Sequence, residues 1–253
     1  MTSAETKPRD LSNVVNETFR VYKANFIRLI AIVAIVEVIQ FAIGAIVFTI
    51  MGVGLVVPFR DWEEWVDGDV GLLIVSMVII LLFSFVLYSL MEGALIHAIT
   101  GQYTKRPIEI ARAYIFVWRR IGALLGAVLL AGIAVGAMAI TIIGIPFAVY
   151  FGVRWFGVPQ AVILEAKSPR EALSRSSDLV KNTWWRVAGI LVVLVLIVGA
   201  MGGILGITLG LIPWIGESLV MMLVTPIGVI GATLLYYDLV FRKEGHSLEL
   251  MTR

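Results

Sequence analysis

The sequence predicts an all-α, polytopic membrane protein with six transmembrane helices and three cytoplasmic amphipathic helices that lie at the membrane interface. Of its 253 residues, 60% are hydrophobic and 15% are charged, whereas soluble domains are about half apolar and a quarter charged. The apolar residues form runs long enough to cross roughly 30 Å of hydrocarbon, which requires about 20 helical residues. Lysine and arginine gather between alternate runs. We therefore expect one membrane domain over residues 1–253.

Residues 1–26 are expected to form a polar tail followed by an amphipathic helix. Between Leu11 and Phe26 the apolar side chains recur three and four residues apart, with Asn13, Arg20 and Lys23 on the opposite side. This spacing is typical of a helix lying in the membrane interface. It is equally typical of a helix packed on the rest of the protein, and both interpretations stay open.

Residues 27–100 hold the first two predicted spans, within 27–57 and from 70 to about 98. Between them, the segment 58–69 carries five acidic residues and one arginine. The spacing of the acids matches no calcium loop, so we favour a solvated loop over a cation site. Trp62 and Trp65 are predicted to anchor this loop at the headgroup boundary, where tryptophan is enriched.

Residues 101–166 repeat this plan of an amphipathic helix followed by two spans. Pro107 opens the predicted amphipathic helix, because proline suits the first helical position. The third span covers 121–143, and Gly144-Ile145-Pro146 makes a tight connection to the fourth. We therefore expect the third and fourth spans to form a helical hairpin, with a break or bend near Pro159.

Residues 167–241 contain the third amphipathic helix and the last two spans, and 242–253 form a polar tail. Ser168-Pro169-Arg170-Glu171 has the residues of a capping box with proline at the first helical position. The fifth span is expected at 187–212 and the sixth at about 218–241, kinked at Pro226. Glycines in the third and fifth spans would allow close packing, within one chain or between two.

The distribution of cationic residues predicts the orientation. Eighteen of the 20 lysines and arginines fall before the first span, between spans two and three, between spans four and five, or after the sixth. The positive-inside rule therefore places both termini and all three amphipathic helices on the cytoplasmic side of the inner membrane.

Arginine and lysine at the entries to the spans are candidate contacts for anionic lipid headgroups. Aromatic rings beside these cations suit the interface, since the rings lie among headgroups and the cations reach phosphates. We expect this junction to reflect convergence on interfacial physics, although descent from a repeated unit stays open. The candidate lipid contacts are Arg28, Arg119, Arg120, Arg175, Lys181 and Arg186, and the interfacial anchors are Trp62, Trp65, Trp118, Trp184 and Trp185.

Three polar residues within the spans form a second candidate site. Counting along the helices puts Glu37 and Arg154 at similar depths, with Gln40 one turn from Glu37. Charges inside a membrane are costly and are functional candidates by default. Such a pair could gate a polar path or bind a lipid or an anionic ligand, but we favour a structural ion pair joining spans one and four.

The sequence offers little support for catalysis. It contains no cysteine and two histidines, which excludes thiolate metal sites and cysteine nucleophiles. A lipid-modifying enzyme would need Glu92, His97 and Asp238 to converge. We expect no cofactor, no metal site and no catalytic residue. Nucleic acid is not favoured as a partner, because the basic residues follow the predicted interfacial helices.

Several motifs resemble a known family. They are Gly144-Ile145-Pro146, the run 159–165, Ser168-Pro169-Arg170-Glu171 with Ala172-Leu173, Trp184-Trp185-Arg186-Val187, and the closing stretch 233–239 with 242–245. Together they are similar to the bacterial and archaeal integral-membrane family named for the membrane domain of glycerophosphoryl diester phosphodiesterases. The resemblance implies a six-span membrane module, sometimes fused to a lipid-related hydrolase. It implies no hydrolase activity here, because the soluble barrel that carries the catalytic residues is absent.

Three functional hypotheses follow. The leading one is a non-enzymatic protein that interacts with lipid, or acts as a scaffold, at the cytoplasmic leaflet. Its partners would be anionic headgroups, with other membrane proteins or a second copy as open possibilities. The alternatives are a transporter or channel for a small solute or lipid that uses Glu37 and Arg154, and, with less support, an intramembrane lipid-modifying enzyme.

Overall fold

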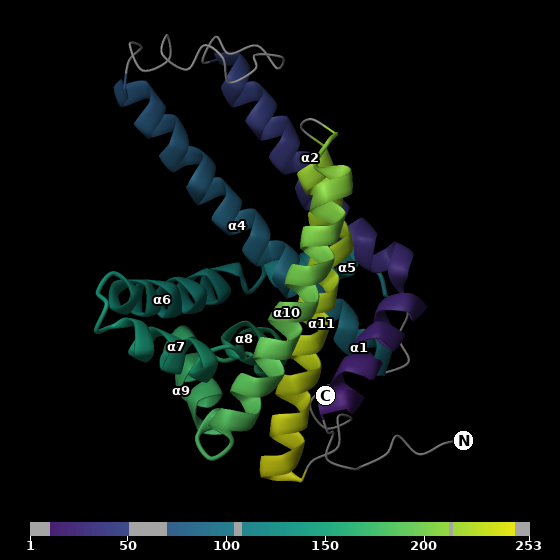
Figure 1. Ribbon diagram of the computed structural model, residues 1–253, viewed down its shortest axis with the longest axis vertical. Coiled ribbons are helices and arrows are strands. Elements are labelled where there is room, and N and C mark those ends of the chain that lie inside the picture. Colours follow the sequence, from purple (N-terminus) through teal and green to yellow (C-terminus); the bar gives the residue numbers. More distant parts are fainter. Residues whose placement is uncertain (1–10, 51–69, 104–107, 213–214, 246–253) are drawn as a thin grey trace.

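The computed structural model describes residues 11–50, 70–103, 108–212 and 215–245. Within these ranges the chain is helical and contains no strand (Figure 1). The helices are α1 (Leu11–Ala24), α2 (Phe26–Ile50), α4 (Val70–Tyr103), α5 (Ile110–Trp118), α6 (Ile121–Ala139), α7 (Ile145–Arg154), α8 (Val158–Glu165), α9 (Pro169–Val180), α10 (Trp184–Leu209) and α11 (Gly216–Glu244).

Six helical segments are long and apolar enough to span a membrane. Many of their large apolar side chains are exposed, including Leu82 on α4, Ile133 on α6 and Leu196 on α10. Such extensive apolar exposure suits contact with acyl chains rather than water. The prediction of an all-α polytopic membrane protein is confirmed. The six segments are Phe26–Val47, Ile74–Gly101, Ile121–Ala139, Ile145–Glu165, Trp184–Leu209 and Gly216–Glu244.

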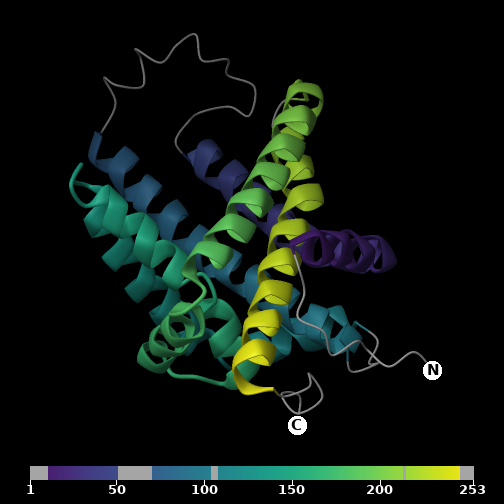
Figure 2. The ribbon, with the colours of Figure 1, turned by 60° about the horizontal axis from the view of Figure 1, so that its bottom comes forward.

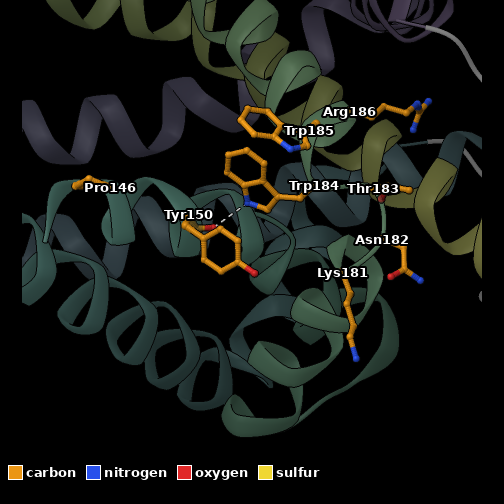
Figure 3. Close-up of a pocket in the computed structure, with 8 residues that line it drawn as sticks. All are labelled: Pro146, Tyr150, Lys181, Asn182, Thr183, Trp184, Trp185 and Arg186. Atoms are coloured by element: carbon orange, nitrogen blue, oxygen red, sulfur yellow. Dashed lines mark hydrogen bonds between the residues drawn. The ribbon is translucent and has the colours of Figure 1, made fainter.

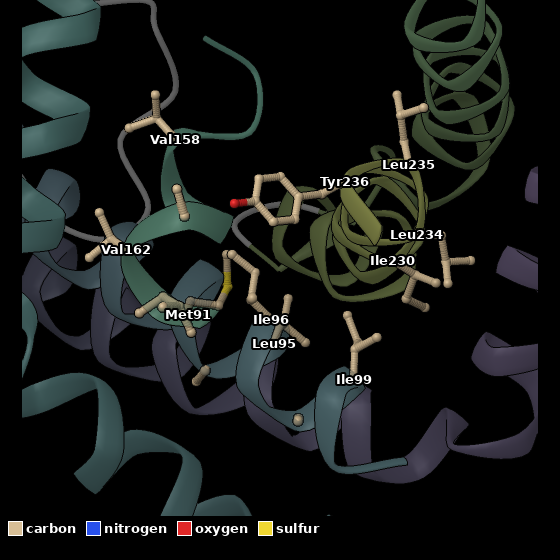
Figure 4. Packing of buried hydrophobic residues seen from close by; sticks show 14 of the residues in the cluster. Met91, Leu95, Ile96, Ile99, Val158, Val162, Ile230, Leu234, Leu235 and Tyr236 are labelled. Atoms are coloured by element: carbon tan, nitrogen blue, oxygen red, sulfur yellow. The ribbon is translucent and has the colours of Figure 1, made fainter. Parts of the chain in front are cut away.

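Helix α11 forms the centre of the structure. It runs alongside α10 (Figures 1 and 2) and also contacts α1, α2 and α4. Its second half is almost entirely buried. Figure 4 shows Leu234 and Tyr236 of α11 together with Ile96 of α4 and Val158 of α8 in this core. The apolar core therefore joins the last part of α11 to the last part of α4 and to the short helix α8.

Tyr22 fixes α1 against α11 beside a proline. Pro226 has no N–H and crowds the preceding turn, which weakens the helical bonding there. The Tyr22 hydroxyl donates a hydrogen bond to the Leu223 carbonyl at 2.8 Å, and burial raises the pKa of this hydroxyl. Val14 and Val21 are buried on the same helix. The apolar face of α1 thus packs on protein, which is one of the two interpretations that its sequence left open.

The other two amphipathic helices also bury their apolar faces against protein. Helix α5 packs on α4, and α9 packs on α6 and α8. Tyr114 of α5 donates to the Ile32 carbonyl of α2 at 2.6 Å, and burial raises the pKa of this tyrosine to about 12. At the start of α9, Ser168 and Glu171 form the predicted capping box.

The segment predicted as a hairpin of spans three and four is bent. Helix α6 packs on α7 as expected, but α6 runs across the direction of α10 and α11 instead of alongside them (Figures 1 and 2). The predicted break near Pro159 is confirmed, since α7 ends at Arg154 and α8 begins at Val158. Pro159 in the first turn of α8 is the local cause, because it has no N–H to donate to the carbonyl four residues earlier and its ring crowds that carbonyl.

Candidate functional site

Two networks of charged side chains tie α8, α9 and α10 to the end of α11. In the first, the guanidinium of Arg175 donates to Glu165 at 3.0 Å and also pairs with Glu244. The Tyr236 hydroxyl donates to the same Glu165 carboxylate at 2.6 Å. This network joins helices separated by up to 71 residues in sequence. Arg175, a predicted lipid contact, is therefore occupied by two carboxylates of the protein.

The second network is built on Asp238. Its side chain is 1% exposed and accepts hydrogen bonds from Arg186 at 2.8 Å and from Arg242 at 2.9 Å. Arg186 is thus held by a carboxylate in the same way as Arg175. Buried carboxylates need such partners, because an unpaired charge out of water is costly.

Arg120 is bound to the protein backbone. Its guanidinium donates to the carbonyls of Val162 and Ile163, at 3.3 and 3.2 Å. A cation beside the last carbonyls of α8 interacts favourably with the negative end of that helix. The guanidinium also lies 4.6 Å from the centre of the Phe116 ring, a cation–π contact. The structure therefore gives Arg120 a role in holding α8.

The structure does not bring Glu37 and Arg154 together. Glu37 is 4% exposed, and it contacts Tyr88 at 3.5 Å and forms a side-chain hydrogen bond with Ser218. Arg154 instead approaches Tyr150 on its own helix, and its Nε is buried without a hydrogen-bond partner. No ion pair among the described residues joins the two. Counting along helices gave their depth but not the side of the molecule on which each lies.

Gln40 contacts Ser84 rather than Glu37. The Gln40 side-chain amide donates to the Ser84 hydroxyl at 2.6 Å. Together with the contacts of Glu37, this bond places polar side chains of α2, α4 and the start of α11 in one cluster. Glu37 and Gln40, which the sequence predicted near Arg154, thus belong to a separate site.

The remaining predicted lipid contacts lie at the surface. Arg28, Arg119 and Lys181 are exposed. Trp118 and Trp185 are exposed by 63% and 84%, which fits side chains that anchor in a headgroup layer. Trp62 and Trp65, predicted to anchor the acidic loop, lie outside the described residues.

An open groove of about 700 Å³ brings several of these residues together (Figure 3). The Trp184 indole N–H donates to the Tyr150 carbonyl at 3.1 Å, and the two rings stack with centroids 5.7 Å apart. Trp185 packs edge-on against Trp184 at 4.8 Å. The groove therefore lies where α7 meets the start of α10. Its lining residues are Pro146, Tyr150, Lys181, Asn182, Thr183, Trp184, Trp185 and Arg186.

The lining of the groove combines one available cation with aromatic surface. Lys181 follows α9 directly and is exposed, and none of the ion pairs among the described residues includes it. Asn182 can donate and accept beside it, and the Tyr150 hydroxyl adds another polar group. Sequence reasoning singled out Lys181 and the two tryptophans but missed Tyr150. The available signal was its position one turn before Arg154.

The residues that an enzyme would require are distributed over different contacts. The His97 ring stacks on Phe116 of α5, with centroids 4.1 Å apart. Asp238 is engaged by Arg186 and Arg242. Among the described residues, no ion pair joins Asp238 to His97, and the contacts of both side chains are with other residues. In the part of the chain that the structure describes, no group of three histidine, aspartate or glutamate side chains could hold a metal ion.

Comparisons with models of known protein families, with curated proteins and with solved structures give no match for this chain. The resemblance to the phosphodiesterase membrane-domain family therefore stays a prediction.

Proposed function

We propose that this protein is a non-enzymatic, lipid-interacting membrane protein that binds anionic phospholipid headgroups at the cytoplasmic leaflet. The groove between α7 and α10 is the headgroup site. The observation that carries the proposal is the meeting of Lys181, Tyr150, Trp184 and Trp185 around one open volume of about 700 Å³. A scaffolding role, in which bound lipid helps to recruit other membrane proteins, is compatible with the same site.

The contacts that the other cations make within the protein favour Lys181 as the residue that attracts the phosphate. Arg175 and Arg186 are paired with carboxylates, and Arg120 is bonded to carbonyls. No ion pair among the described residues includes Lys181, and this residue is exposed to solvent. An ammonium group near an anionic surface contributes about 1 kcal/mol of attraction, and it can approach a phosphate as a compact point charge.

The aromatic side chains favour a lipid over a soluble phosphate compound. Indole rings are enriched at the level of lipid headgroups, because one edge is polar and the rest of the ring is apolar. On α10, the exposed residues Val192, Val195 and Leu196 continue the apolar surface beyond the tryptophans. An acyl chain would follow this surface while the phosphate stays near Lys181.

Native mass spectrometry of the protein released from nanodiscs tests the proposal. We expect retained anionic lipid in wild type, and about fivefold less in Lys181→Gln, since roughly 1 kcal/mol of attraction is lost. Arg170→Gln is the matched control, because Arg170 is an exposed cation on α9 outside the groove. Equal retention of anionic and zwitterionic lipid, or equal losses in the two variants, would contradict the headgroup site.

A second function is favoured by the environment of Glu37. This carboxylate is buried between spans, and none of the ion pairs among the described residues includes it. It contacts Tyr88 and Ser218, and intramembrane carboxylates of this kind mark proton and ion pathways. A pH-sensitive dye in proteoliposomes would report proton flux. Flux that Glu37→Gln abolishes and Glu109→Gln preserves would support a transporter, and flux no greater than in protein-free vesicles would exclude proton coupling.

A further inference from the structure

The chain from α7 to α8 is fixed at one end of α10. The Tyr150 carbonyl accepts the hydrogen bond from Trp184, the first residue of α10. The Ser176 hydroxyl donates to the Arg154 carbonyl at 2.8 Å and accepts from the Gly157 N–H at 3.2 Å. Each of these contacts joins the 150–157 segment to α9 or to the start of α10.

The length of α7 limits how far its first residue can lie from Trp184. From Tyr150 back to Ile145 is five residues, or about 8 Å of helix. Helix α10 has 26 residues and is therefore about 39 Å long. The connection between α6 and α7, at 140–144, thus lies much nearer to Trp184 than to Leu209. Pro146, directly after that connection, lines the same groove as Lys181.

Helix α6 is also held at this end. It begins directly after Arg120, which is bonded to carbonyls of α8. Gly126 lies against Pro169, the first residue of α9: a Cβ on this glycine would be 3.2 Å from the proline ring. In Figures 1 and 2, α6 lies to one side of α10 and α11, and its axis is directed across theirs. The first part of α6 and the end of α7 are therefore both close to α9.

The connection between α6 and α7, at 140–144, is suited to an environment of lipid acyl chains. Ile140, Ile142 and Ile143 are more than four-fifths exposed, and residues 121–153 contain no charge. The Thr141 carbonyl accepts from the N–H groups of Gly144 and Ile145, and the Thr141 hydroxyl accepts from Gly144 as well. Backbone groups within lipid require such internal partners, because no water is present to bond them.

We propose that α6 and α7 form a hairpin inserted into one leaflet, with the acyl chains of that leaflet as its partner. The hairpin enters and leaves at the face where α10 begins. Length and composition permit both segments to cross, but the contacts with α9 and α10 hold their connection on the near side. Because the hairpin returns to the same face, both chain termini still share one side. This inference is independent of whether the groove binds a headgroup.

Single-cysteine labelling in membrane vesicles tests the hairpin, since the chain contains no native cysteine. The reporter is Ile142→Cys, at an exposed position in the connection. Glu217→Cys at the start of α11 and Lys181→Cys in the groove are exposed controls for the two membrane faces. An impermeant maleimide should label the two controls from opposite sides, whichever way the protein is oriented.

The result expected for Ile142→Cys is labelling from the Lys181 side or from neither side. Labelling of Ile142→Cys from the Glu217 side would show a complete crossing and overturn the proposal. A second measurement resolves the depth: a fluorophore on the same cysteine should be quenched more strongly by lipids brominated on the acyl chain than by an aqueous quencher. If an aqueous quencher added on the Glu217 side quenched this fluorophore more strongly than the brominated lipids do, that result would also overturn the proposal.

Discussion

Asp238 is the side chain on which the charged end of α11 depends. Its nearly inaccessible carboxylate receives two arginines, from α10 and from α11 itself. The pattern of cations beside aromatic rings had suggested that Arg186 reaches lipid phosphate. The structure gives that arginine a protein partner, so its replacement tests stability more directly than lipid binding.

Replacing Asp238 by asparagine should destabilise the protein substantially. Removing one partner of a buried ion pair costs about 3 to 5 kcal/mol. We expect about 2 to 3 kcal/mol here, because both arginines are more than a quarter exposed and water screens them. Thermal unfolding in detergent measures the effect. Glu109→Gln breaks the exposed Glu109–Arg112 pair and should cost less than about 1 kcal/mol; equal effects of the two variants would refute this role of Asp238.

The capping box at the start of α9 should show a specific pH dependence. Hydrogen bonds from the Ser168 hydroxyl and the Ser168 backbone N–H hold the pKa of the Glu171 carboxyl below its ordinary value. Because the pKa is lowered in the folded state, the box stabilises α9 fully above the ordinary carboxyl range, and this stabilisation is lost as the pH falls through the lowered pKa. Carbon-13 NMR of Glu171 measures the titration.

Ser168→Ala provides the comparison for that titration. It removes the hydroxyl donor, so the pKa of Glu171 should rise toward its ordinary value while the backbone donor remains. Identical titration curves in wild type and Ser168→Ala would show that the hydroxyl does not hold the carboxylate.

At the scale of helices, the junction between α7 and α8 is packed closely against α9 and α11. Gly157 lies in the break and its N–H donates to Ser176. A Cβ at this position would lie 2.7 Å from the Tyr236 ring and 3.3 Å from the Ser176 hydroxyl. Tyr236 is fully buried, so it cannot move aside cheaply.

Gly157→Ala should therefore weaken the packing of α8 against α11. Overpacking of this kind costs about 1 to 3 kcal/mol, which a lower thermal transition would report. Gly152→Ala is the matched control, because a Cβ on Gly152 of α7 would meet nothing within 4 Å. If Gly157→Ala were as stable as Gly152→Ala, the close contact with Tyr236 would not exist in solution.

The local sequence predicted where helices begin and break, but not the directions in which the helices run. Ser168 and Glu171 determine a helix start by contacts three residues apart, and Pro159 marks a break, so both features could be predicted. The start of α6 is instead fixed by Arg120, which bonds to carbonyls of α8 42 and 43 residues away. Hydrophobic periodicity carries no information on such distant contacts. For the same reason, the sequence predicted Lys181 as a lipid contact and Trp184 as an interfacial anchor, but it did not predict the groove that they line with Tyr150.

At the scale of the whole molecule, the charged networks lie at a different end from the diverging halves of α2 and α4. The ion networks join α8, α9 and the start of α10 to the end of α11, and these helical segments lie toward one end of the structure (Figure 1). Toward the other end, α2 and α4 diverge from α10 (Figure 1), and large apolar side chains on their outer halves are exposed. This division favours a protein whose polar end lies at one membrane surface and meets headgroups there.

Photocrosslinking in membranes can show whether anionic headgroups occupy the groove. An anionic phospholipid with a diazirine beside its phosphate would be activated in vesicles and its adducts mapped by peptide mass spectrometry. We expect adducts concentrated at Tyr150 and at 181–185, and fewer adducts with a zwitterionic lipid carrying the same diazirine. Equal labelling by the two lipids, or adducts spread along α2 and α4 with none in the groove, would show that the groove is not a site for anionic headgroups.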